Sequence, residues 1–485
     1  MEKNLIIISG NDPGYQGRVM QLACAIRESG LIPMVIDLTR LNSGFGNEYN
    51  DKVLRFFRAT NPITKFHKHL IDLGIELIYP THSESAITID NESKNEILEA
   101  CESAIISYAR DPNPNLKSRG LKNINDRLLK GGCDSYLAVL QSITKFQIKK
   151  LLVPNGRFPH QRASVIAALD TGIEVNYYEK GDFSESIYLQ SYSTLDRIKS
   201  QQDVVRILDK YDSETVTSVG AEWFASRIPS ETRKGSNIYA RNFDSPSAGL
   251  QSDNLGGENW IGIFTSSQDE FLSLGKEWHL HEWENQYSAI RLVLEEIDDS
   301  KNVYLRIHPN LATKSHKAFK NELCDISALH KDFPHLKIFM HDEKINSYEL
   351  IKKSSHVVVW DSTIGLEALA MGVNVIELAA SYYDDYTLVN KCFSKSDLSE
   401  IFQKCSSPNP DRAIKFAAYL SLRETLLTDS ARQLIREFDI SDGIRKKLLR
   451  IATMGGSPSV RIAGHHLIDT LRHRSFKTNL KYLFR

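Results

Sequence analysis

Short apolar runs alternate with longer amphipathic stretches along most of the chain. Residues 5–8 and 32–38 are apolar runs rich in isoleucine, and a helical pattern lies between them at residues 19–29. A strand that is buried on both faces of a parallel sheet has this continuous apolar character. These residues therefore predict a βαβ unit, the start of a doubly wound domain.

The same alternation continues through the first half of the chain. It predicts strands at residues 75–79, 150–154 and 173–178, and helices at 94–109 and 161–170. The loop Asn155-Gly156-Arg157 and Glu179 directly follow two of these strands. Because parallel strands end at the same edge of a sheet, we expect these residues on the edge where open α/β sheets bind ligands.

A change of composition marks a boundary in the middle of the chain. Residues 226–259 are rich in Ser, Gly, Pro and Asn, the profile of a linker. Strands and helices then alternate again between residues 260 and 378, which predicts a second Rossmann-like domain. The expected fold is α/β, with two doubly wound parallel-sheet domains facing a central cleft. The expected parts are an N-terminal domain (1–235), a linker (236–259), a C-terminal domain (260–400) and C-terminal helices with a basic tail (401–485).

Composition narrows the class of protein. The chain has 485 residues, 41% hydrophobic and 25% charged, which is typical of a soluble globular protein. Its 60 Lys and Arg nearly balance its 61 Asp and Glu, so nucleic acid is not expected as a partner. The six cysteines include no Cys-x-x-Cys pair, which argues against a zinc site and a disulfide framework. The first apolar run is too short for a signal peptide, and no stretch is long enough to span a bilayer. We therefore expect a cytoplasmic protein.

Three strand-end loops of the second domain combine small or polar residues with the start of a helix. They are Thr265-Ser266-Ser267, His308-Pro309-Asn310 and Asp361-Ser362-Thr363. The first N–H groups of a helix lack intrahelical partners and favour anions. We therefore expect Ser266, Ser267, His308, Ser362 and Thr363 to bind a phosphate. The alternative is that Asp361 or Ser362 only caps its helix and that His308 is a structural histidine.

Two carboxylates of the first domain are candidates for a catalytic base. Glu179 and Asp182 lie in the segment Glu-Lys-Gly-Asp-Phe, and either could accept a proton from an attacking hydroxyl. The alternative is a surface turn in which Glu179 pairs with a neighbouring arginine. The choice between the two acids is open at this point.

Five further residues are candidates for binding a substrate. They are Asn155, Arg157, Asn11, Asp12 and Gly14. The planar guanidinium of Arg157 could pair with a carboxylate or a phosphate. A simple Pro-Gly turn explains the three N-terminal residues equally well.

No metal site or cofactor is expected. His279 and His281 are two residues apart, which on a helix sends them to different faces. The chain also contains no Asp-x-Asp triplet of the kind that holds a divalent metal.

Residues 441–485 hold ten Lys or Arg and only two acidic residues. They could rest on anionic lipid headgroups or form a basic helix packed across the domains.

These segments resemble the capsular polysaccharide biosynthesis glycosyltransferases of the GT-B fold. The resemblance covers roughly residues 151–378 and is carried by NGRFPHQRA, YYEKG, FTSSQDE, RIHPN and WDSTIGLEALAMGVNVIEL. The His-Pro and Ser-Thr pair is similar to that of the Kdo and sialic acid transferases, which use CMP-activated donors. It implies that His308, Ser362 and Thr363 bind the donor phosphate and that Glu179 or Asp182 is the base. Those families often show two adjacent acids before the glycine, where this chain has Glu-Lys-Gly.

The resemblance implies an inverting, metal-independent glycosyltransferase of capsule or lipopolysaccharide biosynthesis. The donor would be a nucleotide sugar, CMP-linked donors included, and the acceptor a glycan or lipid-linked glycan. The protein would be cytoplasmic, with peripheral contact to the inner membrane through its basic tail. One alternative is a CDP-polyol phosphotransferase of the polyglycerolphosphate type, in which His-Pro plus a Ser-rich loop also occurs. Another is a non-catalytic assembly protein that keeps the fold.

Overall fold

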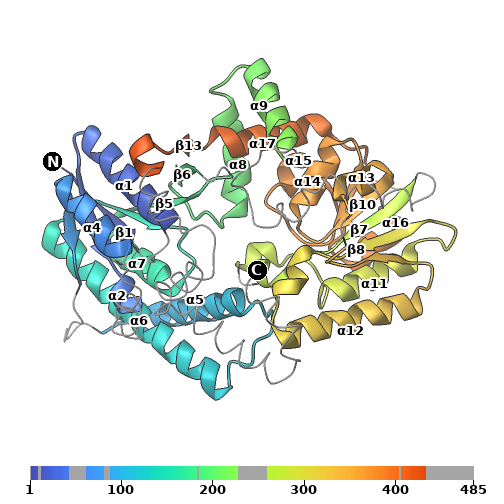
Figure 1. Ribbon diagram of the computed structural model, residues 1–485, viewed down its shortest axis with the longest axis horizontal. Coiled ribbons are helices and arrows are strands. Elements are labelled where there is room, and N and C mark those ends of the chain that lie inside the picture. Colours follow the sequence, from blue (N-terminus) through green and yellow to red (C-terminus); the bar gives the residue numbers. More distant parts are fainter. Residues whose placement is uncertain are drawn as a thin grey trace. The chain divides into compact units, whose positions relative to one another are not determined.

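The computed structural model describes residues 2–8, 13–42, 62–80, 88–182, 185–227, 259–272, 274–343, 345–402 and 406–432. The chain divides into two compact units (Figure 1). Unit 1 comprises residues 1–181, 185–195 and 425–485, and unit 2 comprises residues 182–184 and 196–424. Each unit contains one β-sheet with helices on both of its faces.

Within the described residues, the sheet of unit 1 has seven strands. They are β1 (Lys3–Ile8), β2 (Ile32–Asp37), β3 (Glu76–Ile78), β4 (Lys150–Pro154), β5 (Glu174–Lys180), β6 (Ser186–Gln190) and β13 (Thr425–Leu426). In space their order is β13-β6-β5-β4-β1-β2-β3. Strands β1 to β5 are parallel in a Rossmann-like order. At one edge of this parallel sheet, β6 pairs antiparallel with β5, and β13 pairs antiparallel with β6. Residues 181–185 alone separate β5 from β6, which is too short for a parallel crossover.

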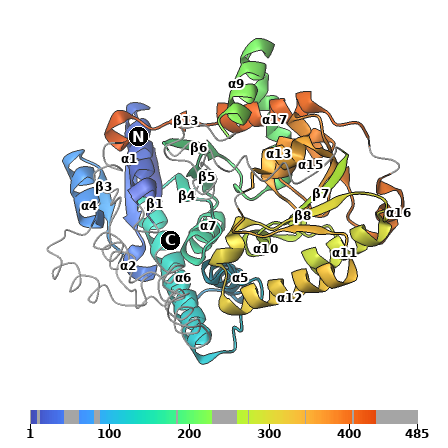
Figure 2. The ribbon, with the colours of Figure 1, turned by 45° about the vertical axis from the view of Figure 1, so that its right-hand side comes forward.

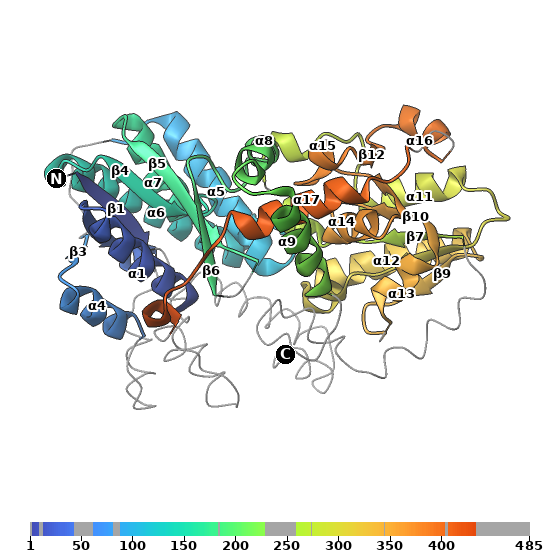
Figure 3. The ribbon, with the colours of Figure 1, turned by 90° about the horizontal axis from the view of Figure 1, so that it is seen from above.

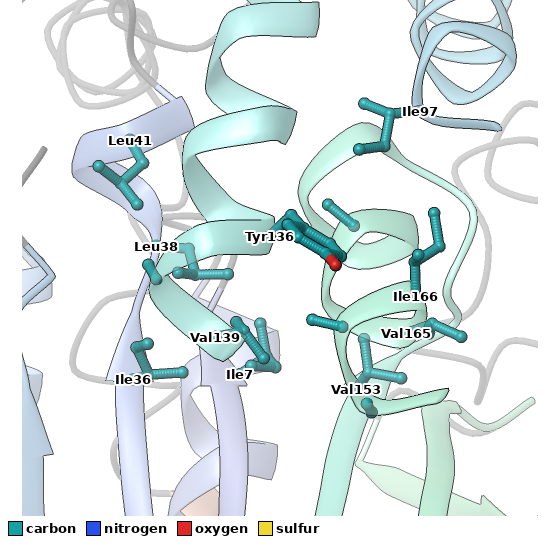
Figure 4. Close-up of a cluster of buried hydrophobic side chains, with 14 of the residues drawn as sticks. Ile7, Ile36, Leu38, Leu41, Ile97, Tyr136, Val139, Val153, Val165 and Ile166 are labelled. Carbon is teal, nitrogen blue, oxygen red and sulfur yellow. The ribbon is translucent and has the colours of Figure 1, made fainter. Parts of the chain in front are cut away.

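Helices cover both faces of the unit 1 sheet. They are α1 (Pro13–Glu28), α2 (Thr39–Asn42), α4 (Pro62–Asp72), α5 (Asn91–Ala109), α6 (Arg119–Phe146) and α7 (Pro159–Asp170). Ile6 of β1 packs in a core with residues of α1 and α4, whereas Ile7 packs in a second core with α5, α6 and α7. Figure 4 shows this second core, with Tyr136 and Val139 of α6 near Ile7 and Val153. Burial on both faces explains why β1 is apolar from residue 5 to residue 8.

Within the described residues, the sheet of unit 2 has six strands, all parallel. They are β7 (Trp260–Phe264), β8 (Val303–Arg306), β9 (Lys337–Phe339), β10 (Ser354–Val359), β11 (Asn374–Glu377) and β12 (Asn390–Lys391). Their order is β12-β11-β10-β7-β8-β9. This is the strand order 3-2-1-4-5-6 of a Rossmann fold read from the other edge.

Helices also cover both faces of the unit 2 sheet. They are α8 (Arg197–Leu208), α9 (Ser213–Ala225), α10 (Gln268–Phe271), α11 (Gln286–Glu296), α12 (His316–Asp332), α13 (Ser347–Lys352), α14 (Thr363–Ala370), α15 (Asp384–Thr387), α16 (Lys395–Ile401) and α17 (Pro410–Leu422), with 3-10 turns η4 (Lys276–Trp278) and η5 (Pro309–Thr313). On one face α11 contacts α12 (Figure 2). On the other, α17 lies against α9 and α14 (Figure 3).

The structure divides the chain differently from the expected domains. Helices α8 and α9 fall in the expected N-terminal domain, yet Val204 and Trp223 share a core with Phe416 of α17. An added Cβ at Gly220 of α9 would lie 2.2 Å from the carbonyl oxygen of Ile414. At the other end, the chain returns to unit 1, where β13 pairs with β6. The unit boundaries are therefore at residues 195 and 425 instead of 235 and 400, and all of the expected linker except Asn259 lies outside the described residues.

Two Rossmann-like units confirm the expected α/β fold class. The central cleft between them stays a prediction. In the described part of the chain, no helix is both long enough and apolar enough to cross a bilayer. The basic segment 441–485 lies outside the described residues, so its contact with a membrane also stays a prediction.

Candidate functional site

The carboxyl edge of the unit 2 sheet brings the three strand-end loops together. Strand β7 lies between β8 and β10, and all three are parallel, so their loops leave the sheet at one edge. After β7 the chain continues to β8 on one side, and after β10 it continues to β11 on the other. The carboxyl ends of the neighbouring strands β7 and β10 therefore mark the topological switch point, where open α/β sheets bind their ligands.

Buried polar contacts hold the loop after β7. The backbone N–H of Ser266 donates to Oε1 of buried Gln286 at 2.6 Å, and its carbonyl accepts from Nε2 at 3.4 Å. The hydroxyl of Ser267 donates to Asp269 at 2.7 Å, and the hydroxyl oxygen of Thr265 accepts from the backbone N–H of His308 at 2.8 Å. The buried hydroxyl of Ser266 interacts with the carboxyl group of Asp361 and has no other hydrogen-bond partner within the described residues. It is therefore the hydroxyl of this loop best able to meet a ligand.

His308 precedes the turn η5 and is half-buried. The backbone N–H of Asn310 donates to its Nδ1 at 3.1 Å. A ring nitrogen that accepts a hydrogen bond carries no proton, so this contact assigns the neutral ring with its proton on Nε2. Neutral His308 can then donate one hydrogen bond to a phosphate oxygen. A protonated His308 would have to break the contact with Asn310.

The loop after β10 begins α14. Ser362 caps this helix, because its hydroxyl accepts from the N–H of Ile364 at 3.3 Å, and Thr363 is the first helical residue. The capping role therefore belongs to Ser362 and not to Asp361. An added Cβ at Gly365 would lie 2.1 Å from the hydroxyl of Tyr383, which donates to the Ser362 carbonyl at 2.8 Å. The close approach that a glycine permits at this position is therefore made by the hydroxyl of Tyr383.

Asp361 lies at the switch point and is only 2% exposed. Its Oδ1 has no hydrogen-bond partner within the described residues. Burial raises the pKa of Asp361 to about 8; the neighbouring Ser266 hydroxyl opposes this shift, and the charge of Glu270 adds to it. The carboxyl group is therefore mostly protonated at neutral pH.

A buried charge network supports the loop after β7. Lys314 lies 2.8 Å from Glu322 and 3.9 Å from Asp269, the acceptor of the Ser267 hydroxyl. Burial raises the pKa of Glu322, and Lys314 opposes this shift. Ser267 thus belongs to a network that positions the loop, which leaves its hydroxyl less available to a ligand than that of Ser266.

Asn155 and Arg157 lie at the switch point of unit 1, after β4, which pairs with β1. The side-chain oxygen of Asn155 accepts from the backbone N–H of Arg157 at 2.9 Å. The guanidinium of Arg157 donates to the hydroxyls of Ser103 and Ser107 on α5, both at 2.8 Å. In this arrangement Arg157 fastens its loop to α5.

Glu179 lies near the end of β5, at the same edge of unit 1, and is half-buried. The hydroxyl of Tyr15 donates to its Oε1, as does the backbone N–H of Lys180 at 2.9 Å. Burial and the charge of Glu179 raise the pKa of Tyr15 well above its ordinary value. No hydrogen bond to Oε2 is present within the described residues. One carboxylate oxygen is thus held and the other can accept a proton.

Asp182, the second candidate base, is held by two donors. Its Oδ2 accepts from Nε1 of Trp223 at 2.5 Å and from Arg227 at 3.2 Å. Arg227 also pairs with Glu367 at 3.4 Å and lies 3.8 Å from the centre of the Trp223 ring. Burial disfavours the charge of Arg227, but Glu367 and Asp182 raise its pKa. Asp182 is paired with a cation and Glu179 is not, and a proton on Asp182 would weaken its ion pair with Arg227, which favours Glu179 as the base.

The three N-terminal candidates for substrate binding lie at or before the start of α1. Asn11 and Asp12 lie outside the described residues, and Gly14 is the second residue of α1. Within the described residues, no group of three or more His, Cys, Asp or Glu could hold a metal ion. His281 lies against the Trp360 ring, with 4.6 Å between ring centres, and burial lowers its pKa.

Sequence reasoning missed Tyr15 and a polar cluster at the ends of β2 and β3. Asp37 Oδ2 lies 3.1 Å from Nε2 of His67, whose Nδ1 lies 3.2 Å from the Tyr79 hydroxyl. Asp37 also accepts from the backbone N–H of Thr39 at 2.9 Å. The only available signal was an aspartate that ends an apolar strand, because no motif links residues so far apart.

Comparison with known proteins matches part of unit 2 to a protein family. Residues 259–386 match a family described as "putative O-antigen biosynthesis protein". No curated protein matches the chain in sequence. Among solved structures, the chain is similar to the KpsC β-Kdo 2,4 transferase of Thermosulfurimonas dismutans, at 13% identity and a TM-score of 0.35, over 59% of this chain and 87% of that one. It is also similar to MurG of Acinetobacter baumannii, at 9% identity and a TM-score of 0.28, over 90% and 99%.

The family match includes all three strand-end loops of unit 2. Over residues 259–386 the chain is therefore similar to this O-antigen biosynthesis family.

Proposed function

We propose that the chain is an inverting glycosyltransferase of surface polysaccharide biosynthesis, which takes its sugar from a nucleotide-activated donor. One observation carries the proposal. Hydroxyl, imidazole and helix N-terminal groups gather at the carboxyl edge of a parallel sheet, around its switch point. These groups lie within the residues that match the O-antigen biosynthesis family.

In this proposal the donor phosphate binds at the carboxyl edge of unit 2. The Nε2–H of His308, the Ser266 hydroxyl and the N-terminus of α14, with Thr363, donate to the phosphate oxygens. Fixed donors of this kind stabilise the negative charge that builds on the departing nucleotide. They can do so without a divalent metal, so we propose a metal-independent reaction. CMP-linked donors are the first to test, because of the resemblance to Kdo and sialic acid transferases.

Glu179 is the proposed base. Tyr15 holds Oε1, and Oε2 takes the proton of the acceptor hydroxyl as the hydroxyl oxygen bonds to the anomeric carbon. The bond between the anomeric carbon and the phosphate oxygen breaks in the same step, and its electron pair leaves with the nucleotide. A single displacement of this kind inverts the configuration at the anomeric carbon. The proposed acceptor is a glycan hydroxyl, free or lipid-linked.

Nucleotide binding and product mass test the proposal directly. Calorimetry with CMP, CDP and UDP should find at least one that binds, and mass spectrometry should find a product heavier by one sugar. A product heavier by a polyol phosphate would instead support the CDP-polyol phosphotransferase. A chain that binds none of the three nucleotides would support a non-catalytic assembly protein.

Two variants separate the proposed roles. Glu179→Gln should keep nucleotide affinity but lower turnover by roughly 100-fold or more, since general bases contribute about that much. His308→Ala should weaken nucleotide binding by about ten- to 100-fold, the cost of a hydrogen bond to a charged group. Glu174→Gln, at the other end of β5, and His330→Ala, on the exposed side of α12, are matched controls and should change neither value. Full activity in Glu179→Gln or full affinity in His308→Ala would remove that residue from the mechanism.

A further inference from the structure

Asp361 has no evident structural task. Ser362 caps α14, so Asp361 does not serve that end of the helix. Its Oδ1 is buried without a hydrogen-bond partner in the described part of the chain. A buried carboxyl oxygen without a partner is costly, so the position of Asp361 at the switch point calls for a ligand that completes its contacts.

The Ser266 hydroxyl lies beside Asp361 at the ends of neighbouring strands. Gln286 holds the backbone of Ser266 through both of its amide atoms, which fixes the place of the hydroxyl. Apart from Asp361, this buried hydroxyl has no hydrogen-bond partner among the described residues. Two such groups therefore share one place, next to the N-terminus of α14.

The charges around Asp361 decide which ligand fits. Glu270 of α10 adds negative charge beside it, and Tyr383, the titratable group that precedes α15, is buried and uncharged at neutral pH. His308, at the end of β8, is assigned as neutral by its contact with Asn310. An ionised Asp361 would add a second negative charge and repel a phosphate, whereas a protonated Asp361 can donate a hydrogen bond to it.

We infer that Asp361 binds the nucleotide donor as a neutral carboxylic acid, donating a hydrogen bond to a phosphate oxygen beside the Ser266 hydroxyl and the N-terminus of α14. This inference rests on the proposed function and adds that donor binding is coupled to a proton. The nucleotide selects the protonated form of Asp361, and above the pKa of the free protein it must take up a proton to bind.

The sign of the effect follows from this linkage. Burial places the pKa of Asp361 at about 8. Well below that pH the acid is already protonated and affinity is constant. Above it, affinity falls by up to tenfold for each pH unit, because one proton must be bound with each nucleotide. The phosphate of the ligand contributes no step there, since its second ionisation lies near pH 6.

Calorimetry of the full chain at pH 7 and pH 9 tests the inference, with whichever of CMP, CDP and UDP binds most tightly. The wild-type protein should bind about tenfold more weakly at pH 9 than at pH 7. Asp361→Asn, which cannot ionise, should show less than about a twofold difference, because an amide keeps a donor at all pH values. Ser266→Ala should bind more weakly at both pH values. Its affinity should begin to fall at a higher pH than that of the wild type, because the hydroxyl that lowers the pKa of Asp361 is gone. Thermal melts at both pH values check that each variant is folded.

The outcomes separate this inference from the proposed function. Binding in which Asp361→Asn keeps the wild-type pH dependence overturns the inference alone. A wild-type protein that binds equally at pH 7 and pH 9 does the same. Failure of all three nucleotides to bind at any pH rejects the proposed function and, with it, the inference.

Discussion

Asp361 of unit 2 and Glu179 of unit 1 both lie near the carboxyl edge of a Rossmann-like sheet, and the two acids have opposite surroundings. Asp361 of unit 2 is buried, and its Oδ1 has no hydrogen-bond partner within the described residues. Glu179 of unit 1 is half-buried and receives hydrogen bonds from Tyr15 and from the backbone of Lys180. Similar strand ends thus hold similar side chains in different environments.

This difference shows how one type of fold can assign two tasks to one functional group. A carboxyl group without hydrogen-bond donors in a buried place keeps its proton and can donate it to an anion. A carboxylate that donors hold at one oxygen can use the other to accept a proton. The environment, more than the residue type, separates a ligand-binding acid from a candidate base.

Replacing Asp361 should give the largest effect on stability. Its folded-state pKa of about 8 lies above the value of about 3.9 in an unfolded chain. As pH rises from 4 to 8, the unfolded state ionises and the folded state does not, so the wild-type protein loses stability. Asp361→Asn does not titrate. Its free energy of unfolding should therefore rise relative to that of the wild type by up to about 1.4 kcal/mol for each pH unit in this range.

Urea unfolding of both proteins at pH 5, 7 and 9 measures the difference between their free energies of unfolding. All other titrating groups are the same in the two proteins, so their contributions cancel in this difference. Asp298→Asn is the control, because Asp298 is exposed and hydrogen bonds from Ser300 lower its pKa. Its stability difference from the wild type should stay flat over the same range. If Asp361→Asn is equally flat, Asp361 is not a neutral buried acid and the contrast with Glu179 fails.

Gly365→Ala should give the next largest effect. The added methyl group would meet the hydroxyl of Tyr383, which is fully buried and cannot move away cheaply. Overpacking of this kind costs about 1 to 3 kcal/mol. Urea unfolding should show the loss, and nucleotide affinity should fall as the start of α14 shifts. The double variant with Tyr383→Phe should regain part of the stability, because it lacks the hydroxyl oxygen that the added methyl group would meet. If the double variant regains nothing, the Tyr383 hydroxyl is not the cause of the loss.

The strands were predictable because burial on both faces leaves a direct trace in the sequence. The strand Lys150–Pro154 coincides with a predicted strand, and Trp260–Phe264 begins the second predicted alternation at the expected residue. The order of strands leaves no such trace. Asp361 and Ser266 meet only because β10 pairs with β7, a choice that no local periodicity reveals. The sequence therefore predicted both loops, but it did not predict that the buried side chains of Asp361 and Ser266 are neighbours.

The division into units was harder to predict for the same reason. The helices α8 and α9 precede the Ser- and Gly-rich segment, and proximity along the chain suggested that they belong to the first domain. Their apolar faces pack instead on α17, about 200 residues later. Tyr15 was missed because a single tyrosine in the first turn of a helix carries no signal until its partner, Glu179, is known.

Tyr15→Phe should give the smallest effect and the sharpest test of the acid in unit 1. The variant removes the hydroxyl that holds Oε1 of Glu179 and leaves the ring, so packing is kept. If Glu179 is the base, turnover should fall by about tenfold, near the lower limit for losing a hydrogen bond to a charged group. Nucleotide affinity should be unchanged, since the proposed phosphate donors all belong to unit 2. Tyr211→Phe, on an exposed tyrosine, is the control for loss of a phenol.

Combined with Glu179→Gln, Tyr15→Phe should add almost nothing, because Tyr15 can act on turnover only through the carboxylate that it holds. An equal loss in both backgrounds would mean that Tyr15 acts by another route and that its contact with Glu179 does not position the base.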